Sequence, residues 1–111
     1  MKLTTLAIAI GIIGAATLPA SRAADANSNW DKHCLKCHGK DGKGGTRMGR
    51  QAGVKDYTDP KVQEAMKDDV ALKTVKAGIT EKGKEKMKPY AGELSDDEIK
   101  ALIAHMRTFK K

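Results

Sequence analysis

The clearest pattern of hydrophobic and polar positions lies near the C-terminus. Apolar side chains recur there at the spacing of one helical face, at Ile99, Leu102, Ile103, Met106 and Phe109. Ser95 and Glu98 have the spacing of a capping box, and Leu94 and Ile99 that of a hydrophobic staple. The pattern predicts an amphipathic terminal helix that packs its apolar face on an earlier helix, the one that carries Trp30.

That earlier helix is predicted from the residues around Trp30. Its start lies either at Ser28–Asp31, which resembles a capping box, or at Asp25. Gly39 is predicted to end it, because glycine is the usual residue just past a helix. Residues 40–55 are rich in Gly, Lys and Arg and are predicted to form a loop.

Two further helices are predicted in the middle of the chain. Thr58-Asp59-Pro60 is typical of a helix start with proline in the first turn. Asp68 or Asp69 is predicted to cap another helix, which ends near Gly78. Residues 80–92 hold two glycines, one proline and many charges, and are predicted as a second loop. No segment shows a convincing alternation typical of a strand.

The N-terminal residues differ from the rest in hydropathy. Lys2 precedes an uncharged, largely apolar run over residues 3–18, and Pro19 breaks that run. Ser21 and Ala23 then place small residues at −3 and −1 of a cut after Ala23, so residues 1–23 are interpreted as a cleaved signal peptide. The alternative, an uncleaved membrane anchor, is disfavoured because a spanning helix needs about 20 apolar residues. Export implies an oxidising compartment, here the periplasm.

Composition limits the hydrophobic core. Of the 111 residues, 88 remain after such a cut, with a net charge of +5, and only 12 of these are Leu, Ile, Val or Phe. That share is roughly 14%, below the level of about 20% at which a charged chain is expected to be disordered. One domain is expected, a multidomain enzyme is excluded, and the fold needs a disulfide, a metal, a partner or an apolar cofactor.

The two cysteines, Cys34 and Cys37, are followed directly by His38. A zinc site lacks a second ligand pair at the usual spacing, and a thioredoxin-like redox pair lacks its βαβ context. The sequence C-x-x-C-H is the signature of covalent haem attachment, since thiols three residues apart share a helical face and the next residue can offer an imidazole to iron. A buried porphyrin also supplies the missing apolar contact, so the chain without haem is predicted to be largely unfolded.

These residues give the chain a family resemblance. Residues 24–111 resemble the small bacterial monohaem class I cytochromes c from end to end. The matching pieces are Trp30, Cys34-Leu35-Lys36-Cys37-His38, the glycine-rich run 39–44, Met87-Lys88-Pro89-Tyr90 and the terminal helix over 94–109. The resemblance implies an all-α cytochrome c fold of about four short helices around one haem c held by two thioethers, with the first and last helices crossing.

The chain departs from that family pattern at two places. His105 stands where the family often has an aromatic residue against the first helix, so Trp30 is expected to pack on an imidazole. The loop Gly45-Thr46-Arg47-Met48-Gly49 lacks the proline that the family often has there. A backbone carbonyl of this loop is still expected to accept the second N–H of His38.

The second axial ligand of the iron has several candidates. Met66 and Met106 lie on predicted apolar faces and are expected to pack in the core, His33 is expected at the surface, and His105 is expected to be partly buried. The residues alone favour Met87 over its rival Met48, because both lie in predicted loops but Met87 lies in the half that must cover the far face of the haem. The resemblance strengthens that choice, so the predicted iron ligands are His38 and Met87.

Histidine and methionine ligation indicates a soluble electron carrier. Thioether ligation raises the reduction potential, and a filled coordination sphere disfavours oxygen or peroxide chemistry, so the chain is not expected to be an enzyme. A dedicated cytochrome subunit of a larger periplasmic dehydrogenase or oxidase is the alternative. A haem sensor or catalytic haem protein is a third possibility, and it requires Met87 to be absent from the iron or labile.

The charge pattern suggests a partner class. Lysines gather in and just before the Met87 segment, at Lys76, Lys82, Lys84, Lys86 and Lys88. They are predicted to steer the haem edge to redox partners with acidic docking surfaces, although they could serve solubility alone. We expect a monomer that binds no nucleic acid and, after signal cleavage, has no stable membrane insertion.

Overall fold

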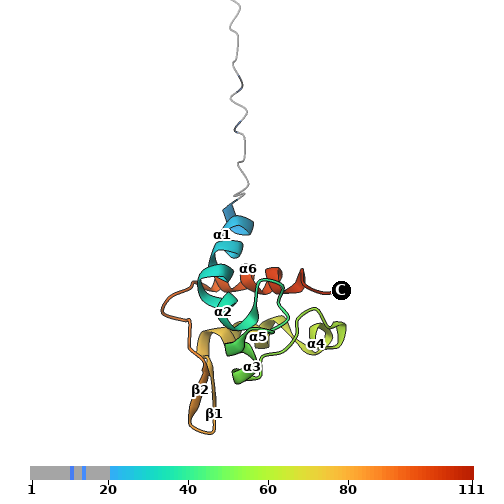
Figure 1. Ribbon diagram of the computed structural model, residues 1–111. Helices are drawn as coiled ribbons and strands as arrows, with labels where there is room; N and C mark the ends of the chain where they lie inside the picture. Colours follow the sequence, from blue (N-terminus) through green and yellow to red (C-terminus); the bar gives the residue numbers. More distant parts are fainter. Residues whose placement is uncertain (1–10, 12–13, 15–20) are drawn as a thin grey trace, which may run out of the picture.

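The first and last helices cross each other, as Figure 1 shows. In this computed structural model the described residues are 11, 14 and 21–111, and of residues 21–24 only the backbone is described. The predicted signal segment 1–23 therefore lies almost entirely outside the described residues. The last helix, α6 (Asp96–Arg107), packs on α1 (Ser21–Asn29). The crossing pair confirms the arrangement that the family resemblance implies.

Helix α6 forms as the sequence predicts. Ser95 Oγ accepts from the backbone N–H of Glu98 at 3.1 Å, and the Glu98 carboxylate accepts from the Ser95 N–H at 3.0 Å. Both bonds of the capping box are thus present. The apolar face of the helix is buried. Ile99 is fully inaccessible to solvent, and Leu102, Ile103 and Met106 are nearly so.

The N-terminal helix starts earlier than predicted. It already runs through Ser28–Asp31, so neither that segment nor Asp25 begins it. Alanines at 23, 24 and 26 have high helix propensity, which favours the longer helix. After α1 the chain continues through a π-helical turn, η1 (Trp30–Cys34), into α2 (Leu35–His38), and Gly39 ends the segment as predicted.

Three helices follow in the middle of the chain. Helix α3 (Arg47–Ala52) interrupts the predicted loop 40–55, which is therefore wrong over these residues; the Thr46 side chain caps it by accepting from the Gly49 N–H. Helix α4 (Pro60–Ala65) starts as predicted, with Asp59 as its N-cap. Helix α5 (Asp68–Ala77) has Lys67 at its N-cap position with no side-chain cap, so the predicted aspartate cap is wrong, and the helix ends at Gly78.

A short antiparallel hairpin replaces the start of the second predicted loop. Strands β1 (Ile79–Glu81) and β2 (Lys84–Met87) pair with Glu81 opposite Lys84 and Ile79 opposite Met87. The two turn residues, Lys82 and Gly83, both have positive φ (51° and 75°), as a two-residue type I′ turn requires. Lysine is unusual at that first turn position, which is why the turn signal was missed. The hairpin extends away from the helical body in Figure 1.

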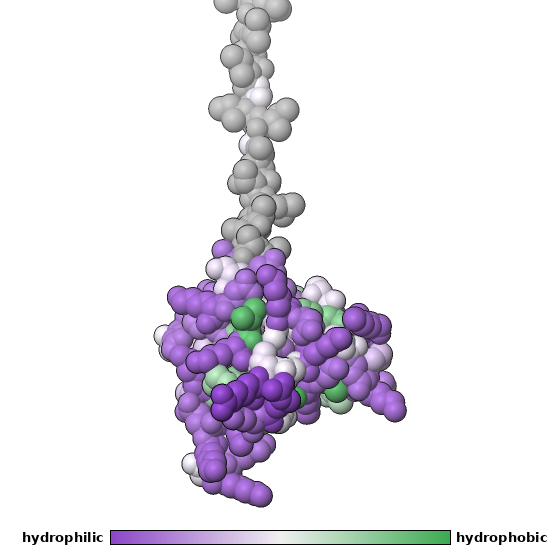
Figure 2. All heavy atoms as spheres, viewed as in Figure 1, coloured by the Kyte–Doolittle hydropathy of each residue, from purple (hydrophilic) through white to green (hydrophobic). Residues whose placement is uncertain are grey.

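The fold is nevertheless all-α in class. The described chain has six α-helices and one π-helical turn. Because α1, η1 and α2 run on continuously, they make five helical segments where about four were predicted, and α3 is the added one. They enclose one buried cluster of hydrophobic side chains, made of Trp30, Ala71, Tyr90, Leu94, Ile99, Leu102, Ile103 and Met106. On the face shown in Figure 2, hydrophilic residues surround small, separate hydrophobic patches. In the part of the chain that is described, no helix has the length and apolarity needed to cross a membrane.

Candidate functional site

Cys34 and Cys37 lie one helical turn apart at the junction of η1 and α2. Both sulfurs are free thiols, and both residues are half-buried. Burial, with a smaller contribution from the neighbouring Cys37, raises the pKa of the Cys34 thiol to about 12. Redox-active C-x-x-C pairs have the opposite property, a lowered thiol pKa. The raised pKa of the Cys34 thiol therefore disfavours a redox pair. Among the described residues, no group of three or more His, Cys, Asp or Glu side chains could hold a metal ion alone.

His38 is the last residue of α2 and is enclosed by aromatic rings. Its imidazole stacks on the ring of Tyr57, with centroids 5.4 Å apart and planes 26° apart. Trp30 contacts it at 5.6 Å with a tilt of 42°. Burial lowers the pKa of His38, so the neutral imidazole that can bind a metal is favoured.

His38 Nδ1 is a buried atom without a hydrogen-bond partner among the described residues. The prediction that loop 45–49 supplies its acceptor is wrong. The carbonyls of this loop are occupied elsewhere: that of Gly45 accepts from Arg50 Nη1, that of Thr46 from the Arg50 N–H, and that of Gly49 from the Val54 N–H. These three carbonyls stabilise the loop and α3, and no carbonyl of the loop accepts from the imidazole.

Helix α3 and its N-cap residue pack against the turn that carries Cys34 and Cys37, called here the cysteine turn. Thr46 Oγ1 lies 2.8 Å from the Lys36 carbonyl and 2.9 Å from the Cys37 carbonyl, and shares its proton between them. A Cβ atom at Gly49 would stand 2.1 Å from the Cys37 carbonyl oxygen, so only glycine allows this approach. These two bracing residues escaped the sequence analysis; Thr46 as a helix cap before a short polar helix was the available signal.

Met87 is the last residue of β2 and not a loop residue. Its side chain is half-buried and packs against the hydrophobic cluster, as those of Cys34 and Tyr57 also do. Its rival Met48 lies on α3, is 40% exposed, and does not belong to the cluster. Met106 is buried in the core and Met66 packs partly buried against it, as predicted. Of the two serious candidates, Met87 alone packs on the core that Cys34 also contacts.

Tyr90 links the segment that follows Met87 to the cysteine turn through a hydrogen bond and a ring contact with His33. Its hydroxyl donates to the backbone carbonyl of His33 at 2.9 Å, and its ring meets the His33 ring edge-on at 5.4 Å. His33 Nδ1 lies 3.6 Å from the Glu93 carboxylate, which also pairs with Lys88 at 2.7 Å. The His33 side chain is only 12% exposed, so the prediction of a surface residue is wrong: Tyr90 and Glu93 cover it.

Trp30 sits at the centre of the aromatic packing. Its side chain is 2% exposed, and its indole N–H donates to the Gly39 carbonyl at 2.9 Å. His105 and Phe109 lie against it, with centroid distances of 5.3 and 5.1 Å. The predicted contact between Trp30 and the partly buried His105 is confirmed, with ring planes tilted by 53°.

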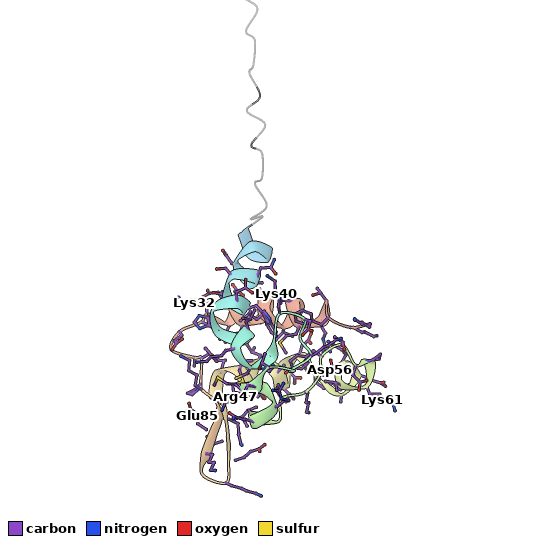
Figure 3. The ribbon with its side chains drawn as sticks, viewed as in Figure 1. Lys32, Lys40, Arg47, Asp56, Lys61 and Glu85 are labelled. Atoms are coloured by element: carbon purple, nitrogen blue, oxygen red, sulfur yellow. The ribbon has the colours of Figure 1, made fainter. Side chains whose placement is uncertain are left out.

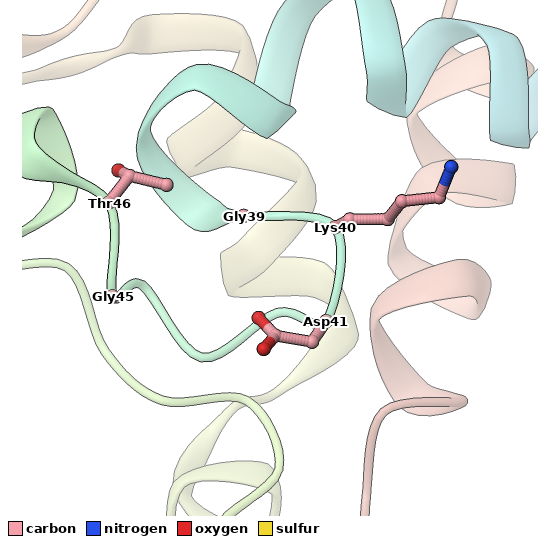
Figure 4. A pocket seen from close by; sticks show the side chains of 5 residues that line it. All are labelled: Gly39, Lys40, Asp41, Gly45 and Thr46. Atoms are coloured by element: carbon pink, nitrogen blue, oxygen red, sulfur yellow. The ribbon is translucent and has the colours of Figure 1, made fainter.

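A shallow cavity of about 530 Å³ lies beside the loop after His38, as Figure 4 shows. Its lining is Gly39, Lys40, Asp41, Gly45 and Thr46. In Figure 4 the Lys40 side chain points away from the loop toward α6. Neither cysteine and no methionine lines the cavity. It is therefore a depression in the loop surface and not the place where the candidate haem-binding side chains meet.

The residues present fit a covalently attached haem. Two free thiols stand one turn apart, an imidazole that burial keeps neutral lies beside them, and a thioether packs on the hydrophobic core. Trp30, Tyr57 and Leu72 add apolar and aromatic surface there. Charged side chains such as Lys32, Lys61 and Glu85 lie at the periphery in Figure 3. The fold and the donor set define a small c-type cytochrome.

Comparisons with known proteins reach the same class. Residues 21–106 match the family model described as "Cytochrome C oxidase, cbb3-type, subunit III", and the chain belongs to this family of c-type cytochrome domains. The solved KustC0563 c-type cytochrome is similar, with 30% identity, a TM-score of 0.67, and coverage of 78% of this chain and 99% of that one. A tyrosine-to-phenylalanine mutant of the same protein gives a TM-score of 0.68 at the same identity and coverage. No curated protein sequence matches the chain.

Family membership fixes the general chemistry. A c-type cytochrome binds haem c covalently and uses its iron for electron transfer. The sequence prediction of a small class I cytochrome c is confirmed at this level.

Proposed function

We propose that this chain is an exported one-electron carrier with a single haem c, attached through Cys34 and Cys37 and ligated by His38 and Met87. The observation that carries the proposal is the common packing of Cys34 and Met87 on one core next to His38. When bound, the haem supplies the ferric/ferrous couple. The protein would hold the His38 and Met87 side chains in place as ligands and keep water away from them.

The choice of ligands has a chemical consequence. A neutral, soft thioether favours ferrous iron, so His/Met ligation raises the reduction potential above that of a bis-histidine site. Two protein ligands leave no open position for a substrate, which supports a carrier that performs no chemistry of its own. We propose periplasmic localisation because the apolar run over residues 3–18 and the small residues at 21 and 23 have the pattern of a cleaved signal peptide.

The charged hairpin suggests how a partner docks. Lys82 and Lys84 are exposed near its turn, and Lys86 is half-buried beside them. Two other lysines of the predicted cluster are already paired within the molecule, Lys76 with Asp96 at 2.9 Å and Lys88 with Glu93 at 2.7 Å. We therefore propose that the unpaired hairpin lysines steer a monomeric carrier to acidic redox partners.

A second function is favoured by the description of the matching family, which refers to an oxidase subunit. In that case the cytochrome stays bound in a larger complex. Size-exclusion chromatography of a native extract separates the two: a free carrier elutes near the mass of the single chain, and a subunit elutes with the complex. Mass spectrometry of the same exported protein measures the cleavage site, the number of haems and the number of thioether bonds.

The ligand assignment is tested by two methionine variants. Met87→Ala is expected to keep the haem on Cys34, Cys37 and His38 but to lower the potential and abolish the sulfur-to-iron charge-transfer absorption of the ferric protein. Its ferrous form is expected to bind carbon monoxide readily. Met48→Ala is the matched control and should change none of these. Reversed behaviour of the two variants, or unchanged spectra in both, would contradict the proposal, as would rapid carbon monoxide binding to the unaltered protein.

A further inference from the structure

His38 lacks the hydrogen bond that usually orients a metal-bound imidazole. Metal-binding histidines almost always donate their second N–H to an oxygen acceptor, which fixes the direction of the ring. Here Nδ1 is buried, and no described group accepts from it. The carbonyls of residues 45, 46 and 49, the nearest expected source, are used within the loop and α3. Among the described residues, therefore, no hydrogen bond to Nδ1 fixes the ring plane.

Tyr57 is placed to do this. Its ring faces the imidazole at 5.4 Å and is the more nearly parallel of the two rings on His38, 26° against 42° for Trp30. Offset stacking at such distances is a favourable aromatic geometry. A flat ring lying on the imidazole restricts its rotation, because turning the imidazole would drive its edge into the neighbouring ring.

The backbone of Tyr57 is anchored on both sides. Its N–H donates to the Gly42 carbonyl at 2.9 Å, and its carbonyl accepts from the Gln63 amide at 2.7 Å. Gln63 is 4% exposed, which is rare for a glutamine, and its amide also donates to the Met106 carbonyl at 2.8 Å. The Arg107 guanidinium donates to Gln63 Oε1 at 3.0 Å. Tyr57 is thus tied to α6, which has more buried residues than any other described helix.

We propose that Tyr57 is a positioning residue for His38, fixing the plane of the axial imidazole by ring stacking in place of a hydrogen bond, with Gln63 holding Tyr57 to α6. The inference rests on the proposed function only in taking His38 as an iron ligand. A fixed imidazole keeps the orientation of the ligand plane the same in both oxidation states. The ring, and not the hydroxyl, carries the role.

Electron paramagnetic resonance of the ferric holoprotein tests this, because its g values depend on the orientation of the axial ligand plane. Tyr57→Phe keeps the ring and should leave the g values unchanged, whereas Tyr57→Leu should shift them and reorder the hyperfine-shifted haem methyl signals in the proton NMR spectrum. Phe109→Leu is the matched control. It removes a ring that contacts Trp30 and His105 but makes no ring contact with His38 among the described residues. Unchanged g values in Tyr57→Leu, or an equal shift in Phe109→Leu, would overturn the inference.

A second measurement needs no variant and decides the matter if Tyr57→Leu fails to fold. In the diamagnetic ferrous holoprotein, nuclear Overhauser effects are expected between the ring protons of Tyr57 and those of His38, and their absence overturns the inference. The ring protons of an iron-bound histidine are shifted strongly upfield by the haem. If the His38 signals lack that shift, the ligand assignment itself fails; if they have it without the Tyr57 contacts, only the positioning role fails.

Discussion

Gly49 lies directly against the carbonyl oxygen of Cys37, where an added Cβ atom would stand 2.1 Å from that oxygen. Gly49 belongs to α3 and Cys37 to the haem-attachment turn, so this close approach is the point where the two helices dock. Thr46 reinforces the same junction by donating to the Cys37 carbonyl. The bracing of the attachment turn therefore depends on a residue without a side chain.

Gly49→Ala is expected to push α3 away from the attachment turn. The clash is with backbone atoms that cannot swing aside, and overpacking of this kind costs about 1–3 kcal/mol. Denaturant unfolding of the holoprotein measures the loss. Gly45→Ala is the matched control in the same loop, because its Cβ would meet no atom within 4 Å. Equal stability of the two variants would show that the junction is not tightly packed.

Gly78→Ala is expected to disturb the Met87 segment. Gly78 has a φ of +73°, and its Cβ would stand 2.5 Å from the Met87 carbonyl oxygen and 2.7 Å from the Pro89 nitrogen. We expect weaker iron–sulfur ligation, seen as a reduced charge-transfer absorption and easier carbon monoxide binding. Gly83→Ala has the same backbone strain, with a φ of +75°, but no atom within 4 Å. If Gly83→Ala weakens the absorption as much, strain and not contact with Met87 is responsible.

The hairpin lysines are expected to control the rate of reaction with anions. Replacing Lys82, Lys84 and Lys86 by glutamine should slow oxidation of the ferrous protein by ferricyanide at low ionic strength by about tenfold and flatten its salt dependence. The exposed lysines at 61, 73 and 100 provide a control triple variant with the same change in net charge. Equal slowing by both triple variants would mean that net charge and not the hairpin directs the encounter. Stability should barely change in either.

His105 is expected to make the holoprotein less stable as the pH falls below neutrality. Burial lowers its pKa from the ordinary value of 6.5, and the nearby Asp31 opposes this only in part. The unfolded chain therefore binds the proton more readily, so the stabilisation present above pH 6.5 is lost as the pH falls through the lowered pKa. His105→Phe should flatten the unfolding free energy between pH 7 and about pH 5.5. Parallel pH profiles for the two proteins would rule out this role.

Local sequence signals determined the elements whose partners lie within a few residues. The capping box of Ser95 and Glu98, the Asp59 cap followed by Pro60, and the stops at Gly39 and Gly78 were all predictable. Their hydrogen bonds join groups at most four residues apart, so a short stretch of sequence contains both partners. The spacing of Cys34, Cys37 and His38 belongs to the same kind of information, and with it the class of protein could be predicted.

The tertiary structure alone decided where distant segments meet. Helix α3 forms where Thr46 and Gly49 can dock on Cys37, and a hairpin forms where Met87 pairs with Ile79, although neither segment has a strong local pattern. The π-helical turn at Trp30–Cys34 likewise has no local pattern that predicts it. The stacking of Tyr57 on His38 likewise joins residues far apart in the chain. Such contacts depend on three-dimensional packing energies, which no short stretch of sequence contains.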